Sequence, residues 1–290
     1  MFKPSDIKTN VILAPYTFYK IGGPAEMFFV ANDRESLEGV LNYVIKKDIS
    51  YIILGTGSNV LVPDEGLKGM VIINRASNFI YDEENKIVTA DSGGALRKLV
   101  WDMALRGWAG LEYFGNIPGT VGGAVVGNAG ANEHSISEEI KWIKFVDGAG
   151  EIIIEPRDFF NFEYRTSRLK QGYKAVVLEV CFSMFSKNPE EILKVLQEDD
   201  NRRKSNNPTG SSCGSFFKNI SEDLPAGKII DDLGLKGLQV GGAKVSEEHA
   251  NFIVNTGYAA AKDVKELAEI VAKKVKEEMG YELEREVVYL

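Results

Sequence analysis

Apolar positions along the chain follow two different periods, which predict amphipathic helices and short buried strands. Apolar residues three and four positions apart, as at Leu37, Leu41 and Val44, are typical of a helix with one buried face. Pro189 favours the first turn of a helix, and Gly280 favours the end of one. We therefore expect helices over residues 36–47, 96–106, 189–204 and 261–279.

Continuous apolar runs indicate the strands. Residues 140–147 and 151–156 are two such runs on either side of Gly148 and Gly150, which is the pattern of a β-hairpin. The composition changes from strand-rich to charged and helical near residues 186–189, and we place a lobe boundary there. Further strands are expected over residues 25–31, 50–55, 69–75, 174–185 and 281–290.

Composition excludes several classes of protein. The chain has 290 residues, 44% hydrophobic and 26% charged, which is typical of a globular protein with two or three lobes. Its net charge of -8 argues against binding to nucleic acid or anionic membranes. Two cysteines and two histidines favour neither a disulfide framework nor a metal site. We find no signal-peptide pattern and no membrane-spanning apolar run, which favours the cytoplasm.

The segment LGTGSNVLV, residues 54–62, follows a predicted strand and has the composition of an anion-binding turn. Gly55 and Gly57 allow a tight turn that brings N–H groups close to a ligand, and Ser58 and Asn59 add side-chain donors. The segment lacks the third glycine of a dinucleotide-binding fingerprint and the Gly-Lys-Ser/Thr of a P-loop. Taken by itself, it is better interpreted as a structural turn.

A second segment, GNIPGTVGGAVVGNAGA over residues 115–131, is denser in glycine. So many glycines sacrifice side-chain packing and cost conformational entropy. A flexible linker would be less apolar than a segment that contains Ile117, Val121 and Val125. We therefore favour a cradle in which the backbone lies against a flat or anionic cofactor.

Seven segments of the chain, in order, resemble the UDP-N-acetylenolpyruvoylglucosamine reductases, a family also called UDP-N-acetylmuramate dehydrogenases. The similarity runs from about Tyr16 to the end of the chain, and the ordered set is far more specific than any one segment. The segments are YKIGGPAEMF, LGTGSNVLV, IPGTVGGAVVGNAGA, FEYRTSRL, SCGSFFKN, AGKIIDDLGLKG and GGAKVSEEHANFIVN.

The resemblance implies an α+β fold. Two lobes, residues 1–75 and 76–188, form an FAD-binding module of the vanillyl-alcohol-oxidase (PCMH) type. Residues 189–290 form a carboxy-terminal α+β substrate-binding lobe, whose last strand returns to the active site. The chain's length is similar to that of the subclass without an extra substrate-covering insertion.

The activity implied is that of a cytoplasmic oxidoreductase of peptidoglycan synthesis, with FAD held non-covalently. NADPH, the co-substrate, reduces the flavin and leaves. UDP-N-acetylglucosamine enolpyruvate then enters the same pocket and is reduced to UDP-N-acetylmuramate. The partners implied are these small molecules, with no nucleic acid, membrane or metal.

The resemblance also assigns the cofactor contacts to the two glycine-rich segments. The contacts to the FAD pyrophosphate are expected at Gly55, Thr56, Gly57, Ser58 and Asn59. Contacts further along the same cofactor are expected at Gly119, Thr120, Gly122 and Gly123.

Hydride addition to the terminal vinyl carbon leaves negative charge on the other vinyl carbon and its carboxylate, so the site needs a cationic donor and a proton donor. Arg165 matches the family arginine that grips this carboxylate, a bidentate role suited to a guanidinium. Ser215 matches the family's proton-donating serine, a weak acid suited to a strongly basic carbanion-like centre. Without the resemblance, Arg165 is equally well a structural partner of Glu163, and Ser215 is better interpreted as a turn residue.

The third catalytic residue is chosen from two glutamates. Glu284 and Glu286 alternate onto one face of the predicted last strand, which is otherwise simply a solvated face. The family's acidic residue precedes a valine, and this selects Glu286. The family often has arginine two places later, where this chain has Val288, so the neighbours of the carboxylate differ.

Three further residues are expected to bind substrate. Tyr164 is placed to stack on the substrate or hydrogen-bond to it, and Asn219 matches a substrate-contacting asparagine of the family. The family usually has proline after this asparagine, where the chain has Ile220. Arg203 lies in a basic run that either contacts a diphosphate or the NADPH 2′-phosphate, or is a solvated helix end.

Two other functions stay open at this point. The first is another FAD-dependent oxidoreductase of the same fold that acts on an alcohol or aldehyde, and many such enzymes tether the flavin to His or Cys. The second is a non-catalytic binder of flavin or UDP-sugar. Arg165, Ser215 and Glu286 together argue against a binder, because binding requires no proton donor.

Overall fold

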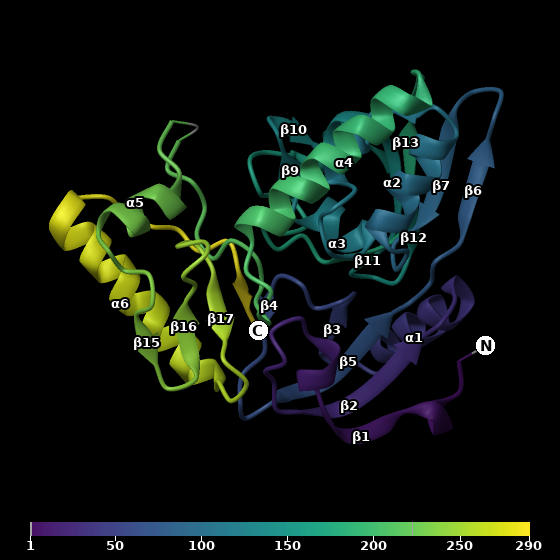
Figure 1. Cartoon of the computed structure of the whole chain (residues 1–290). Helices are drawn as coiled ribbons and strands as arrows, with labels where there is room; N and C mark the ends of the chain where they lie inside the picture. The colour runs from purple at the N-terminus through teal and green to yellow at the C-terminus, as the bar shows by residue number, and fades with distance from the viewer. Residues whose placement is uncertain (1, 222) are drawn as a thin grey trace. The chain divides into compact units, whose positions relative to one another are not determined.

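The computed structural model describes residues 2–221 and 223–290, and the chain divides into two compact units (Figure 1). Each unit has its own hydrophobic core. Our division into lobes at residues 75 and 188 stays a prediction. Unit 1 contains the residues up to Lys8, Met27–Gly55 and Gly69–Arg202, and unit 2 contains Thr9–Glu26, Thr56–Lys68 and Arg203–Leu290.

The first sheet has the strand order β1-β2-β5-β3, and helix α1 packs on its part in unit 1. Helix α1 begins where the Asp33 carboxylate accepts a hydrogen bond from the Ser36 N–H and the Ser36 hydroxyl accepts one from the Asp33 N–H. Strands β3 and β5 are parallel. The elements are β1 (Lys8–Ile12), β2 (Pro24–Ala31), α1 (Arg34–Lys46), β3 (Tyr51–Leu54) and β5 (Leu67–Asn74).

The second sheet lies within unit 1 and is antiparallel, with the order β12-β11-β13-β7-β6. Its core cluster includes buried residues of helices α2, α3 and α4. The predicted hairpin is confirmed, because β11 and β12 pair antiparallel. The elements are β6 (Phe79–Asp82), β7 (Ile87–Asp91), α2 (Leu96–Leu105), α3 (Val121–Val126), β11 (Ile140–Asp147), β12 (Ile152–Pro156), β13 (Ala175–Ser183) and α4 (Pro189–Asn206).

Unit 2 is built around helices α5 and α6 and the small sheet β15-β16-β17 (Figure 1). Helix α6 begins where the Asp263 carboxylate accepts the Ala260 N–H, and it ends at Gly280, whose φ is 76°. Strand β18 pairs in parallel with β4. The elements are β4 (Val60–Leu61), α5 (Ala226–Asp232), β15 (Gln239–Val240), β16 (Ala243–Val245), β17 (Ile253–Asn255), α6 (Ala261–Met279) and β18 (Val288–Tyr289).

Short elements complete the chain. Strand β8 (Trp108–Ala109) pairs with β14 (Phe185–Ser186), and β9 (Gly130–Ala131) pairs with β10 (His134–Ser135). None of the helices within residues 2–221 and 223–290 is both long enough and apolar enough to cross a membrane. The short 3₁₀ helices are Pro4–Asp6, Ala14–Tyr16, Glu112–Phe114, Ile136–Glu139 and Arg157–Phe160.

The α+β class and all four predicted helices are confirmed, and α6 has the predicted bounds. The predicted last strand is wrong in extent, because only Val288–Tyr289 forms a regular strand. The residues before it are held by single backbone hydrogen bonds, from the Lys218 N–H to the Glu284 carbonyl and from the Glu286 N–H to the Phe216 carbonyl. These isolated bonds do not continue as a ladder.

Candidate cofactor and active site

The second glycine-rich segment forms a turn and the short helix α3 in unit 1, and it is fastened to the loop after β7. The N–H groups of Val121 and Gly122 donate to the carbonyls of Gly94 and Ser92, at 2.9 and 2.8 Å. The Thr120 hydroxyl accepts the Gly123 N–H at 3.3 Å and so begins the helix. These bonds occupy three successive N–H groups of the turn, those of Val121, Gly122 and Gly123.

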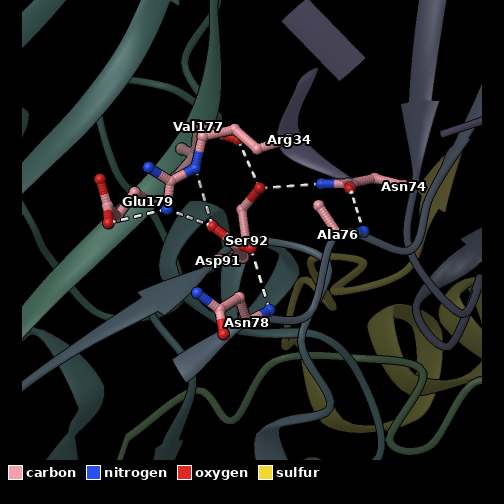
Figure 2. A network of polar contacts seen from close by, with 8 residues as sticks. All are labelled: Arg34, Asn74, Ala76, Asn78, Asp91, Ser92, Val177 and Glu179. Carbon is pink, nitrogen blue, oxygen red and sulfur yellow. Dashed lines mark hydrogen bonds and ion pairs between the residues drawn. The ribbon is translucent and has the colours of Figure 1, made fainter. Parts of the chain in front are cut away.

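Ser92, whose carbonyl accepts the Gly122 N–H, is itself held by a side chain from β5 and a backbone carbonyl from β13 (Figure 2). Its hydroxyl donates to the Val177 carbonyl at 2.5 Å and accepts from the Asn74 amide at 2.8 Å. The Asn74 oxygen in turn accepts the Ala76 N–H. The turn therefore rests on a satisfied, buried polar network, which is rigid because every member has a partner.

The residue before Ser92 belongs to a charged group beside the same network (Figure 2). The Arg34 guanidinium lies 2.5 Å from the Asp91 carboxylate and 2.8 Å from that of Glu179. Both carboxylates are buried, and the other Asp91 oxygen accepts the Asn78 N–H. The hydrogen bonds and charges of both carboxylates raise the pKa of Arg34, although burial opposes this. Nothing in the local sequence predicts this group.

Packing within the protein requires glycine at Gly55 and Gly57 of the first glycine-rich segment. A Cβ at Gly55 would collide with the Thr120 side chain, within unit 1. A Cβ at Gly57, in unit 2, would lie 2.7 Å from the Tyr16 carbonyl oxygen, and the φ of Gly57 is +63°. Both positions therefore require glycine whether or not a cofactor binds.

Gly122 and Gly123 differ in the space beside them. A Cβ at buried Gly122 would lie 2.8 Å from the Ser92 Cβ. Gly123 is exposed, and a Cβ there would meet only the Thr120 hydroxyl, at 3.4 Å. The open backbone at Gly123 leaves room for a flat or anionic group, so this part of the turn fits FAD. The structure supports a ligand-facing backbone most directly at Gly123.

Arg165 lies in a tight turn in unit 1. The N–H and carbonyl groups of Glu163 and Thr166 pair with each other at 3.2 Å, and Arg165 adopts a φ of +56°. A non-glycine residue with positive φ is uncommon and indicates a position fixed by its surroundings. The half-buried Arg165 guanidinium lies 5.3 Å from the ring of Tyr164, which is itself exposed. A Cβ at Gly130 would collide with this guanidinium.

Ser215, in unit 2, lies between a glycine turn and a buried anchor. Gly214, with a φ of +76°, precedes it. The next two residues are bound by Asn251, which is 3% exposed. The Asn251 carbonyl accepts the Phe216 N–H at 2.7 Å, and its side chain exchanges two hydrogen bonds with the backbone of Phe217 at 2.8 and 2.9 Å. The Ser215 side chain is thus presented from a fixed backbone.

Glu286 lies directly beside this segment. Its N–H donates to the Phe216 carbonyl at 2.9 Å, and its carbonyl accepts the Asn59 side-chain amide at 3.2 Å. Glu286 is half-buried, whereas the Glu284 side chain is 72% exposed and pairs with Lys218 at 2.6 Å. Burial therefore favours the choice of Glu286, and the structure brings Asn59 and Glu286 together with the backbone that follows Ser215.

The substitution of proline by Ile220 has a local explanation. The Ile220 N–H donates to the Leu224 carbonyl at 3.2 Å, a bond that proline does not make. The preceding residue, Asn219, is exposed, and its side-chain oxygen accepts the Ala226 N–H at the start of α5. Arg203 is half-buried in the last turn of α4.

Cys213 fits a structural role. Its thiol is buried and donates to the Val60 carbonyl at 3.1 Å. Burial raises the pKa of the thiol far above its ordinary value, so it is not a nucleophile.

Val288, where the family often has arginine, lies in β18, and its N–H donates to the Asn59 carbonyl.

The candidate residues therefore form two sets. In unit 1 are Gly55, Gly119, Thr120, Gly122, Gly123, Tyr164 and Arg165. In unit 2 are Thr56, Gly57, Ser58, Asn59, Arg203, Ser215, Asn219 and Glu286. Sequence reasoning missed the buried residues that hold these sets in place, above all Ser92 and Asn251, and nothing in the local sequence marks either of them.

Comparisons with known proteins give relatives over nearly the whole chain. Residues 25–154 match a model of an FAD-binding domain, and residues 205–290 match the C-terminal domain of UDP-N-acetylenolpyruvoylglucosamine reductase. The reductase of that name from Clostridium novyi (strain NT) is 41% identical over 285 residues, which cover 97% of this chain and 91% of the relative. That of Bacillus subtilis (strain 168) is 38% identical, with 97% and 93% covered.

A solved structure is similar as well. The crystal structure of UDP-N-acetylenolpyruvylglucosamine reductase from Thermus caldophilus matches with a TM-score of 0.81 at 36% identity. The match covers 96% of this chain and 97% of that chain. The similarity therefore extends over nearly the whole chain and includes most of both units.

Proposed function

The chain belongs to the UDP-N-acetylenolpyruvoylglucosamine reductase family, and from this premise we propose that it reduces UDP-N-acetylglucosamine enolpyruvate to UDP-N-acetylmuramate with NADPH. It is an FAD-dependent oxidoreductase of peptidoglycan precursor synthesis. Its substrates are small molecules, and the enolpyruvyl sugar and NADPH are the specific ones that we propose. We also propose that it works in the cytoplasm, where such precursors are made.

FAD bound here and reduced by NADPH would supply the hydride that this chemistry requires. In our proposal the Arg165 guanidinium binds the enolpyruvyl carboxylate and stabilises the negative charge that spreads into it. The Ser215 hydroxyl gives its proton to the carbon next to that carboxylate. Glu286 is the acidic residue of the same step, and Tyr164, Asn219 and Arg203 contact the rest of the substrate.

One observation carries the proposed chemistry in unit 2. Two backbone hydrogen bonds join the tail to the segment around Ser215: the Glu286 N–H donates to the Phe216 carbonyl, and the Lys218 N–H donates to the Glu284 carbonyl. The half-buried Glu286 pairs through its backbone with the residue directly after Ser215, and this suits proton transfer better than it suits a binding surface. This arrangement favours an enzyme over a non-catalytic binder.

The test follows the flavin absorbance of the purified protein. We expect about one FAD per chain, released by acid precipitation because it is not tethered. NADPH should bleach the yellow colour, and the enolpyruvyl sugar should restore it with formation of the reduced sugar. Bleaching without restoration by this substrate would overturn the proposed substrate and leave a different flavin oxidoreductase.

The two glutamates provide an internal control for the assignment of the carboxylate. Glu286→Gln should slow restoration of the colour by up to ~10², whereas Glu284→Gln, at an exposed position paired with Lys218, should change it less than about twofold. The opposite order would show that Glu284 is the reacting carboxylate.

A further inference from the structure

The second half of the glycine-rich segment has a feature that the cofactor does not require. Asn128, two residues after helix α3, is 3% exposed and has a φ of +44°. Its side-chain amide donates to the carbonyl of Glu163 at 2.8 Å. Glu163 is the first residue of the tight turn that carries Arg165.

Other contacts hold the same turn, and one of the hydrogen bonds joins it to the same segment. The Ser167 hydroxyl donates to the Val126 carbonyl, the last residue of α3, at 2.6 Å. The Lys170 ammonium donates to the carbonyl of Arg165 itself at 3.0 Å. Gly130 lies against the Arg165 guanidinium, where a Cβ would collide with it. The Arg165 turn is therefore attached to the segment directly after the backbone that fits FAD.

The chemistry of Asn128 fits an anchoring role. Asparagine tolerates left-handed backbone better than other non-glycine residues, because its short amide interacts locally. The Oδ1 atom of Asn128 is buried and accepts no hydrogen bond within residues 2–221 and 223–290. A buried acceptor without a donor is unfavourable. The presence of asparagine at this position is therefore best explained by its NH₂ group, which donates to the Glu163 carbonyl.

We propose that Asn128 is a positioning residue for Arg165, and that the glycine-rich segment has two tasks. The exposed backbone at Gly123 faces the cofactor, and residues 126–130 set the direction of the guanidinium that binds the substrate carboxylate. This inference rests on the proposed role of Arg165. Because a guanidinium must be aligned to bind a carboxylate with two hydrogen bonds, a loosened turn weakens substrate binding more than it weakens cofactor binding.

The experiment uses Asn128→Gly, because glycine keeps the left-handed backbone and removes only the amide. The matched control is Asn161→Gly in the same unit, where Asn161 has a φ of 43° and an exposed side chain. Both variants are loaded with FAD, and FAD content, melting temperature, bleaching by NADPH and restoration by the enolpyruvyl sugar are measured.

For Asn128→Gly we expect normal FAD content and bleaching within about twofold of wild type, with the substrate concentration for half-maximal restoration raised about tenfold. Asn161→Gly should change none of these. A second variant, Lys170→Met, keeps the stem and removes the donor to Arg165, and it should raise the same concentration by about two- to threefold.

A double-mutant cycle with Arg165→Lys separates the possible failures. If Asn128 acts through Arg165, adding Asn128→Gly to Arg165→Lys should change restoration little further. Impairment by Arg165→Lys with no effect of Asn128→Gly or Lys170→Met would overturn the inference and leave the proposed function intact. Unimpaired restoration in Arg165→Lys would overturn the proposed role of Arg165 and this inference together. Equal losses of FAD, bleaching and restoration in Asn128→Gly would show a purely structural role and also overturn the inference.

Discussion

Arg165 in unit 1 and Ser215 in unit 2 are each held by a buried asparagine, but the two anchors differ. Asn251 makes three hydrogen bonds to the backbone after Ser215, and both ends of its side chain are used. Asn128 makes one to the turn of Arg165, and its oxygen accepts none among the described residues. The backbone after Ser215 is therefore held by three hydrogen bonds to one buried residue, whereas the Arg165 turn is held by single hydrogen bonds to several residues.

This difference matches the tasks that we propose. A proton donor must be within hydrogen-bond reach of one carbon atom, which requires a precisely fixed backbone. A guanidinium on a long side chain reaches its carboxylate through several rotatable bonds, so a loosened turn weakens substrate binding without removing it. The comparison predicts that damage in the two regions changes different steps.

The largest effect is expected at Ser215. Ser215→Ala should bleach with NADPH at nearly the normal rate, because no proton donor for carbon is needed there. The rate of colour restoration by the enolpyruvyl sugar should fall by the ~10²–10⁴-fold that is typical of losing a positioned acid, or by more. Ser215→Cys should recover part of the rate, since a thiol is a stronger acid of similar reach. Stopped-flow absorbance measures both steps, and equal losses in both would point to a role in flavin positioning instead.

The second largest effect tests the anchor of Ser215 itself. Asn251→Ala removes two side-chain hydrogen bonds and leaves the Phe217 N–H and carbonyl without these partners. Because each lost bond costs about 1 kcal/mol and unsatisfied buried groups cost about 1–3 kcal/mol, we expect about 3 kcal/mol of lost stability. Chemical denaturation measures this, and a loss no larger than that of Asn128→Gly would remove the contrast between the two anchors.

The third prediction compares adjacent glycines in unit 1. Gly122→Val places a side chain against Ser92, so the protein without FAD should lose about 1–3 kcal/mol of stability. Gly123→Val meets little protein, so its stability should stay near that of wild type while FAD affinity falls by a similar free energy. Melting curves and FAD titrations of both variants decide this, and full FAD affinity in a folded Gly123→Val would show that this backbone does not face the cofactor.

The smallest effect concerns the two histidines, one in each region. His249 accepts the Asn251 N–H through Nδ1, and burial lowers its pKa below the ordinary 6.5. The unfolded chain then binds the proton more readily, so this contribution to stability is present above pH ~6.5 and is lost as the pH falls from there through the lower folded pKa.

Melting temperatures measured between pH 7.5 and 5 check this prediction. Carboxylates with a lowered pKa take up protons only below this range, so they do not contribute to the decline. His249→Gln should flatten the decline with falling pH. His134→Gln, at a position beside Glu138, serves as the control for the loss of a histidine in the other unit. A decline that is the same in wild type and His249→Gln would exclude the histidine as its source.

Elements with strong local periodicity could be predicted from the sequence, and α6 shows why. Its apolar face, its acidic first turn and Gly280 all agree on the same bounds. The tail at 281–290 alternates equally well, yet it pairs with the segment around Phe216 by isolated bonds, and local sequence contains no information about that partner.

The positions of the two glycine-rich segments could be read from the sequence, but the residues that support them could not, and the assignment of the site residues stays a prediction. Six glycines between Gly115 and Gly130 indicate a close approach of backbone, but the sequence does not reveal that Gly122 faces Ser92 while Gly123 faces open space. The anchors are equally hidden, because Asn128 and Asn251 bind carbonyl groups 35 and 34 residues away in the chain. Such contacts depend on tertiary structure.

The central claim is that Arg165 binds the substrate carboxylate and that Ser215 supplies the proton. The most direct measurement is the rate of colour restoration as a function of enolpyruvyl sugar concentration, in wild type, Arg165→Lys and Ser215→Ala. Arg165→Lys should mainly raise the half-saturating concentration, because the ammonium lacks the two-pronged geometry. Ser215→Ala should mainly lower the plateau rate. A lowered plateau in Arg165→Lys at unchanged half-saturation, with the reverse in Ser215→Ala, would contradict the account.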